Sequence, residues 1–172
     1  MRHLHLILCF AVAICLSVQT TALGQTEMRP CPDELLSLGY ESIDLPSLDV
    51  EHAWDRAERE AVVLGKYLYG VVQSQSEDLS PALDAEVYAI GVHVNFAMGV
   101  ALHFDEFHLP AGAELWVTDA DGLWQEGPYD FRDNNEHGRM ASGDVPGEWA
   151  VLRLKVPAGL AQDVRLHIEG AA

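Results

Sequence analysis

The chain has 172 residues, of which 27 are acidic and 10 are lysine or arginine, so its formal charge is −17 at neutral pH. This charge disfavours binding to nucleic acid or anionic lipid, because both interactions depend on basic side chains that neutralise phosphates. It permits attraction to a cationic partner, and it also suits a soluble exported protein. The length is sufficient for one domain with a hydrophobic core.

The first 24 residues have the pattern of a secretory signal peptide. The basic Arg2 precedes an apolar run at 6–16, and small residues follow at Ala22 and Gly24. The apolar run is shorter than the ~20 residues that a membrane-spanning helix needs. We therefore expect residues 1–24 to be cleaved off, a secreted or periplasmic location, and no membrane span.

The predicted cleavage leaves one cysteine. Cys9 and Cys15 lie within residues 1–24, so Cys31 has no partner for an intrachain disulfide. Cys31 lies between two prolines, where it is either an incidental thiol or a thiol that reacts or pairs between chains. Residues 25–47 are predicted to form a leader segment with at most one helical turn, around Glu34–Leu38.

Residues 48–170 are predicted to form a single, mostly β domain. Apolar residues recur at helical spacing in 51–64, and the pattern then changes to short alternating runs separated by turn residues. Residues 73–82 are polar and are predicted to be a loop. The expected fold is an antiparallel β-sandwich, jelly-roll-like, with a short N-terminal helix. The predicted strands are 67–72, 87–96, 100–104, 114–118, 123–126, 149–156 and 164–168.

Five pieces of sequence resemble a known family. They are FDEFHLPAGAELWV at 104–117, DG at 121–122, GPY at 127–129, DNNEHG at 133–138 and VPGE at 145–148. In order and spacing they resemble the N-terminal pro-region of secreted, lysyl-endopeptidase-type trypsin-like serine peptidases, and the similarity spans most of residues 44–168. In that family the pro-region is cleaved from a catalytic domain, and it helps folding or restrains activity. The resemblance implies a non-catalytic module, here without the peptidase domain.

The residues themselves do not predict a catalytic or metal site. Ser142-Gly143-Asp144 superficially suggests a protease serine, but neither the Gly-Asp-Ser-Gly nor the Gly-x-Ser-x-Gly motif is present. His103, Asp105 and His108 lie close in sequence, yet polar residues that alternate with apolar ones are also typical of a solvated sheet face. We therefore expect no catalytic residues, no resident metal and no cofactor.

Aromatic residues provide the first group of candidate binding residues. Trp116, Trp124 and Tyr129 are candidates for a platform that stacks on a sugar or contacts a protein. Trp116 is expected to face away from Leu115 and Val117, because successive strand residues point to opposite faces. The alternative is that both tryptophans are buried beneath the helix predicted at 51–64.

The loop after Tyr129 provides the second group. Its Asp and Asn side chains offer oxygen atoms to an irregular calcium site, whereas the same residue types also bond their own backbone in turns. The candidate binding residues in this loop are Asp133, Asn134, Asn135 and His137, and the weak calcium candidates are Asp130, Asp133 and Glu136.

Three functions are compatible with these patterns. The first is a secreted protein-interaction module that binds a trypsin-like peptidase, as a folding aid or inhibitor in trans, or binds another surface protein. The second is a module that binds glycan or a cell surface through its aromatic residues. A hydrolase ranks last, and the chain could also be the remnant of a truncated precursor.

Overall fold

The computed structural model describes residues 29–46, 49, 51–55, 58–59, 73–82 and 84–172. The predicted signal peptide, 1–24, and the predicted strand 67–72 lie outside these residues. Within the described ranges, none of the helices is both long and apolar enough to cross a membrane.

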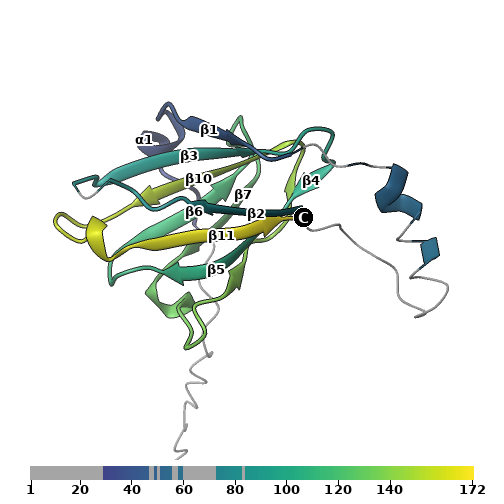
Figure 1. The fold of residues 1–172 in the computed structure, drawn as a ribbon. Helices are drawn as coiled ribbons and strands as arrows, with labels where there is room; N and C mark the ends of the chain where they lie inside the picture. Colours follow the sequence, from purple (N-terminus) through teal and green to yellow (C-terminus); the bar gives the residue numbers. More distant parts are fainter. Residues whose placement is uncertain (1–28, 47–48, 50, 56–57, 60–72, 83) are drawn as a thin grey trace, which may run out of the picture.

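Two β-sheets pack face to face (Figure 1). A five-stranded sheet has the order β1-β3-β10-β6-β7, and a four-stranded sheet has the order β2-β11-β5-β8, while β4 pairs with β9 alone. Neighbouring strands are antiparallel except for β1, which runs parallel to β3. The strands are β1 (Glu41–Asp44), β2 (Gln73–Asp78), β3 (Val87–His93), β4 (Gly99–Val100), β5 (Leu102–His108), β6 (Glu114–Thr118), β7 (Gln125–Tyr129), β8 (Met140–Ala141), β9 (Val145–Pro146), β10 (Trp149–Lys155) and β11 (Arg165–Ala171).

The strand order is that of a jelly roll. When β1, β4 and β9 are set aside, the remaining strands counted in chain order run 1-8-3-6 in the four-stranded sheet and 2-7-4-5 in the five-stranded sheet. This arrangement consists of two interleaved Greek keys. The predicted mostly β, jelly-roll-like sandwich is therefore confirmed.

The main core lies between the two sheets because apolar residues alternate along the long strands. Leu115 and Val117 of β6 face Leu166 and Ile168 of β11 within one continuous apolar cluster. All four are 0 % exposed. Burying each such side chain contributes about 1.5–3 kcal/mol, so this alternation is the main source of stability.

A short helix covers the outer face of the five-stranded sheet. Helix α1 (Asp33–Leu36) packs Leu35 and the neighbouring Cys31 onto Trp116, and these three form a second buried cluster. The predicted helical turn in the leader is confirmed. The leader also supplies β1, which the sequence did not predict, so its described part is joined to the sandwich by both packing and strand pairing.

Several predicted boundaries are wrong. The strand predicted at 87–96 ends at His93, and the strand predicted at 100–104 is divided into β4 and β5, which extends to His108. Residues 73–82 are not a loop throughout, since 73–78 form β2, which pairs with β11 although it contains no apolar residue. The strand predicted at 123–126 lies at 125–129 and includes Pro128, which is tolerated because β7 is an edge strand.

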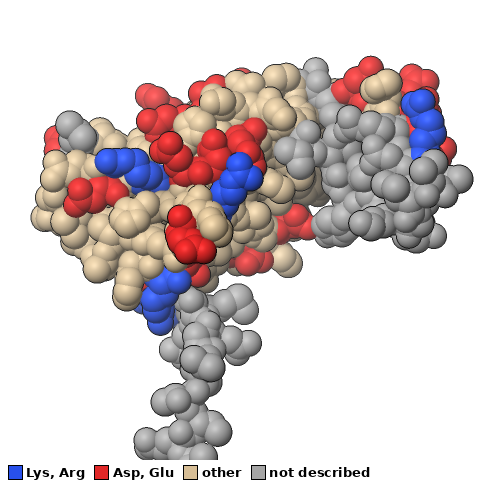
Figure 2. Space-filling model, turned by 60° about the horizontal axis from the view of Figure 1, so that its bottom comes forward, with Lys and Arg blue, Asp and Glu red and all other residues tan. Residues whose placement is uncertain are grey.

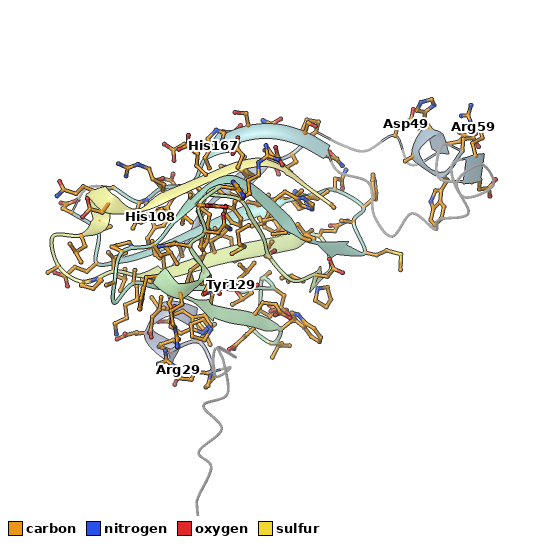
Figure 3. The ribbon with its side chains drawn as sticks, turned by 90° about the horizontal axis from the view of Figure 1, so that it is seen from below. Arg29, Asp49, Arg59, His108, Tyr129 and His167 are labelled. Carbon is orange, nitrogen blue, oxygen red and sulfur yellow. The ribbon has the colours of Figure 1, made fainter. Side chains whose placement is uncertain are left out.

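The helix predicted at 51–64 falls partly within the described residues. Residues 51–55 and 58–59 are helical, and Trp54 is 65 % exposed. Figure 3 shows Asp49 and Arg59 standing away from the two sheets. The described part of this segment therefore does not cover the tryptophans of the sandwich.

Candidate functional site

The structure separates the candidate binding residues instead of gathering them. The β6–β7 turn, which carries Trp124, follows the last residue of β6. The loop after β7 begins at the opposite end of the sandwich, because Tyr129 pairs with Leu115 near the start of β6. The aromatic candidates and the loop candidates therefore do not form a single site.

Trp116 is not available to a ligand. Its side chain is 1 % exposed, and its indole N–H donates to the backbone oxygen of Arg29 at 3.0 Å. The alternative that Trp116 is buried is therefore the correct one, but the covering element is α1 and not the helix at 51–64. Trp124 is different, since it is 47 % exposed. The predicted platform of two exposed tryptophans is wrong.

The β6–β7 turn presents two apolar side chains on a rigid backbone. Asp119 bonds Trp124 twice, accepting from its N–H through Oδ1 and donating its own N–H to the Trp124 oxygen, both at 3.1 Å. Gly122 has φ of +71°, and a Cβ there would lie 2.7 Å from Leu36 of α1. On this framework Leu123 is 86 % exposed next to Trp124. We call Leu123 and Trp124 the hairpin tip.

Tyr129 has a structural role. Its hydroxyl accepts a hydrogen bond from the backbone N–H of Gly143 at 3.1 Å. Burial raises the pKa of the Tyr129 hydroxyl above its ordinary value of 10.0. Tyr129 is half-buried, and its hydroxyl is already hydrogen-bonded within the protein.

The 130–138 loop is held together by its own side chains. Asp130 caps the short 3-10 helix Phe131–Asp133 by accepting from the backbone N–H of Arg132, and Asp133 accepts from the backbone N–H of Asp130. The carboxyl of Asp130 also pairs with the guanidinium of Arg132, which lowers the pKa of that carboxyl. These carboxylates bind backbone and guanidinium groups.

The two asparagines of the loop fasten it to neighbouring segments. Asn134 accepts from the N–H of Leu109 at 2.9 Å and donates to its oxygen at 2.8 Å. Asn135 donates to the oxygen of Arg139 and accepts from the N–H of His137. The side chain of His137 is exposed beside Glu136.

These bonds support the alternative in which Asp and Asn stabilise the loop. Among the residues that the structure describes, no three His, Cys, Asp or Glu side chains are grouped in a way that could hold a metal ion.

Ser142 also has a structural role. Its hydroxyl accepts from the N–H of Leu102 at 2.9 Å and donates to the oxygen of Gly143 at 3.0 Å. With 8 % of the residue exposed, the hydroxyl links β5 to the segment after β8. The Ser142 hydroxyl is therefore used to connect backbone segments, although Ser142-Gly143-Asp144 superficially resembles a protease motif.

The outer face of the four-stranded sheet brings together three residues that the sequence analysis did not connect. The Ser76 hydroxyl lies 3.1 Å from Nε2 of His167, and Nδ1 of His167 lies 2.5 Å from Oδ1 of Asp105. They come from the adjacent strands β2, β11 and β5. No local sequence signal links Asp105 to Ser76, 29 positions before it, or to His167, 62 positions after it.

Irregular pairing places these side chains in one row. Ile168 and Gly170 of β11 are separated by one residue, whereas their partners on β2 are separated by two, one of which is Ser76. His167 and Ile168 are adjacent in β11, whereas their partners on β5 are separated by Asp105. Such extra residues are β-bulges, which redirect side chains and occur frequently beside active sites.

The two ionisable members of the row affect each other. The hydrogen bond with Asp105 raises the pKa of His167 above 6.5. The same bond lowers the pKa of Asp105 below 3.8. Figure 3 shows His167 on the side of the sandwich opposite Arg29, which precedes α1. The row therefore lies on the sheet face that α1 leaves uncovered.

The charge of the surface is uneven. Figure 2, in which the bottom of the molecule as seen in Figure 1 comes forward, shows acidic side chains in groups, with basic side chains as isolated spots between them. Such a surface attracts cationic partners by long-range electrostatics.

Comparison of the chain with protein-family models, with curated proteins and with solved structures finds no match.

Proposed function

We propose that the chain is a secreted or periplasmic protein-interaction module that acts on a trypsin-like peptidase in trans, as a folding aid or an inhibitor. The observation that supports this best is the hairpin tip, in which Leu123 and Trp124 are exposed on a turn closed by Asp119. Exposed aromatic and aliphatic side chains on a preorganised backbone are suited to protein contacts, since little entropy is lost on binding.

The resemblance to a peptidase pro-region supports the same proposal. Its pieces supply core residues of the sandwich, including Phe104 and Phe107, and the loop bonded through Asn134. Residues that carry the resemblance thus contribute to the core of this fold. A pro-region acts by contacting its peptidase, so a related fold with an exposed tip is suited to a similar contact.

The surroundings of the tip indicate the chemistry of the partner. Asp119 and the exposed Asp121 lie in the same turn. The partner surface would offer an apolar pocket for Trp124. Basic groups would surround this pocket, because acidic groups there would repel Asp119 and Asp121 and oppose association.

The test is capture from the secreted fraction of the producing organism. That fraction is passed over the immobilised chain, and retained proteins are identified by mass spectrometry and assayed for peptidase activity. We expect a trypsin-like peptidase to be retained with altered activity. The double variant Leu123→Ala/Trp124→Ala should weaken its binding by roughly 30-fold, as expected for a hot spot of about 2 kcal/mol.

Phe131→Ala is the matched control. Phe131 is 51 % exposed, like Trp124, but lies at the opposite end of the sandwich. Binding should be unchanged in this variant. The proposal fails if no peptidase is retained, or if both variants bind it equally well.

The exposed ring of Trp124 also favours a second candidate, a glycan- or cell-surface-binding module. Trp116 and Tyr129 do not add to such a surface, because one is buried and the other half-buried. Retention of polysaccharide in place of a peptidase, with loss of retention in Trp124→Ala, would favour this candidate.

A further inference from the structure

We propose that Ser76, His167 and Asp105 form a nucleophilic site that hydrolyses carboxylic esters. This activity goes beyond the proposed binding role and uses a different surface. A serine nucleophile requires a base in hydrogen-bond contact and a third group that orients the base. The row provides this connectivity, with Ser76 Oγ 3.1 Å from His167 Nε2 and His167 Nδ1 2.5 Å from Asp105 Oδ1.

The hydrogen bonds determine which nitrogen of His167 carries the proton. An ionised carboxylate only accepts hydrogen bonds, so Nδ1 must donate to Asp105. In the neutral imidazole, Nε2 is then the unprotonated nitrogen, and it accepts from the Ser76 hydroxyl. This tautomer is the one that general-base catalysis needs.

The backbone is irregular at both partners of His167. Ser76 and Asp105 each lie at a β-bulge, on the two strands that flank β11. A regular antiparallel ladder needs no bulge to place side chains of neighbouring strands side by side. Here β2 and β5 both lose regular backbone hydrogen bonding to β11 at the positions where Ser76 and Asp105 meet His167. β2 is also the edge strand of its sheet within the described residues, so backbone N–H groups on its outer side pair with no described strand and are the candidates to bind a developing oxyanion.

The reaction takes place in two steps. Ser76 Oγ attacks the acyl carbon of the ester while its proton moves to His167 Nε2, and the C–O bond to the alcohol breaks as that proton is transferred to the leaving oxygen. Water then attacks the acyl-serine and gives a proton to Nε2, and the proton returns to Ser76 Oγ as the acid leaves. The net reaction converts ester and water into acid and alcohol.

The position of the site indicates the class of substrate. Ser76 is exposed on the outer face of a sheet, and about 30 % of the side-chain surface of its two partners is exposed. An open face of this kind accepts short acyl groups that project from a larger molecule. Small activated esters have the same reacting group and are suitable probes.

The experiment uses a fluorophosphonate probe and p-nitrophenyl acetate with the full chain. The probe forms a bond between Ser76 Oγ and phosphorus as fluoride leaves, and the proton moves to His167. We expect mass spectrometry to locate the adduct on Ser76. Labelling and ester hydrolysis should be lost in Ser76→Ala and fall about 100-fold in His167→Gln, as expected for the loss of a general base.

Asp105 acts through His167 and is tested as a positioning residue. Asp105→Asn should lower the rate and move the rising limb of the pH–rate profile to lower pH, because the carboxylate no longer favours protonated His167. A purely structural role for Asp105 would leave this limb in place.

Matched controls separate this site from unspecific surface chemistry. Ser74→Ala removes an exposed hydroxyl from the same strand, and His108→Gln removes an exposed imidazole from the same sheet. Both variants should retain labelling and hydrolysis. The proposal is overturned if folded wild type gives no adduct on Ser76, or if His167→Gln labels at the same rate. Leu123→Ala/Trp124→Ala should not change labelling, so the two proposals fail independently.

Discussion

The guanidinium of Arg153 in β10 donates a hydrogen bond of 2.6 Å from Nη1 to the backbone oxygen of Leu35 in α1. Arg153 is 2 % exposed, its Nε donates to Thr118, and its guanidinium lies 5.7 Å from the ring centre of Tyr40. Burial lowers the pKa of Arg153 below its ordinary value. The bond fastens the leader to the sheet through a buried cation.

Replacing Arg153 by alanine should therefore loosen the leader. The change leaves the hydroxyl of Thr118 without a donor and removes one of the two donors to the oxygen of Leu35, the other being the N–H of Leu38. The expected loss is about 1–3 kcal/mol. Denaturant unfolding of both proteins measures the loss. Lys155→Ala, which removes an exposed pair with Glu34, is the control and should change stability far less, because solvent screens the pair. Equal losses in the two variants would contradict the role assigned to Arg153.

Cys31 should react slowly in the folded protein. Burial raises the pKa of its thiol from 9.0 to about 11, and the residue is 3 % exposed. At pH 8 the thiolate fraction is then lowered about 100-fold. Maleimide labelling followed by peptide mapping should show slow modification in buffer and fast modification in guanidinium chloride. Fast labelling of the folded chain would contradict this and restore the possibility of pairing between chains.

Asn134→Ala should destabilise the fold although Asn134 lies in a loop. The variant removes both hydrogen bonds to the buried backbone of Leu109. The expected loss is about 1–3 kcal/mol in the free energy of unfolding. Glu136→Ala is the control in the same loop, because that side chain is 84 % exposed and its removal should change stability by at most about 0.5 kcal/mol. A similar melting temperature for both variants would contradict the prediction.

The bond between His167 and Asp105 should make stability depend on pH. The pKa of His167 is raised, so its contribution is complete below the ordinary value of 6.5 and is lost as pH rises through the higher folded value. The pKa of Asp105 is lowered, so its contribution is present above 3.8 and is lost as pH falls through the lower folded value.

The pair therefore stabilises the protein most between the two ordinary values, from 3.8 to 6.5. Because about a third of each side chain is exposed and solvent screens the pair, the gain is under about 1 kcal/mol. The difference in unfolding free energy between wild type and His167→Gln, measured across pH, should be largest in this window and smallest at alkaline pH. A difference that grows towards alkaline pH would have the wrong sign.

The elements that the sequence predicted well are those with strong local patterns. Successive side chains of β6 point to opposite faces of the sheet. The structure places Leu115 and Val117 in the core and Trp116 on the other face, beneath α1. The Asp119–Gly122 turn has the residues that a tight hairpin requires, and Gly122 has the expected positive φ. Local sterics and the period of the strand determine these features.

The missed elements lack such patterns. β2 reads QSQSED, and its pairing with β11 is through the backbone, which leaves no apolar signal. β1 is a four-residue strand whose partner lies 49 positions away. The sequence treated Trp116 and Trp124 alike, as both exposed or both beneath a helix, because their spacing does not show which one α1 reaches.

By itself, the sequence determined a mostly β sandwich with an alternating core and defined turns, because these depend on neighbouring residues. Only the tertiary structure decided which side chains remain exposed and which residues meet on a face. Ser76, Asp105 and His167 are distant in sequence and meet because β2 and β5 flank β11 with a bulge at each contact. Strand order and register are properties of the whole chain, and no local run of residues specifies them.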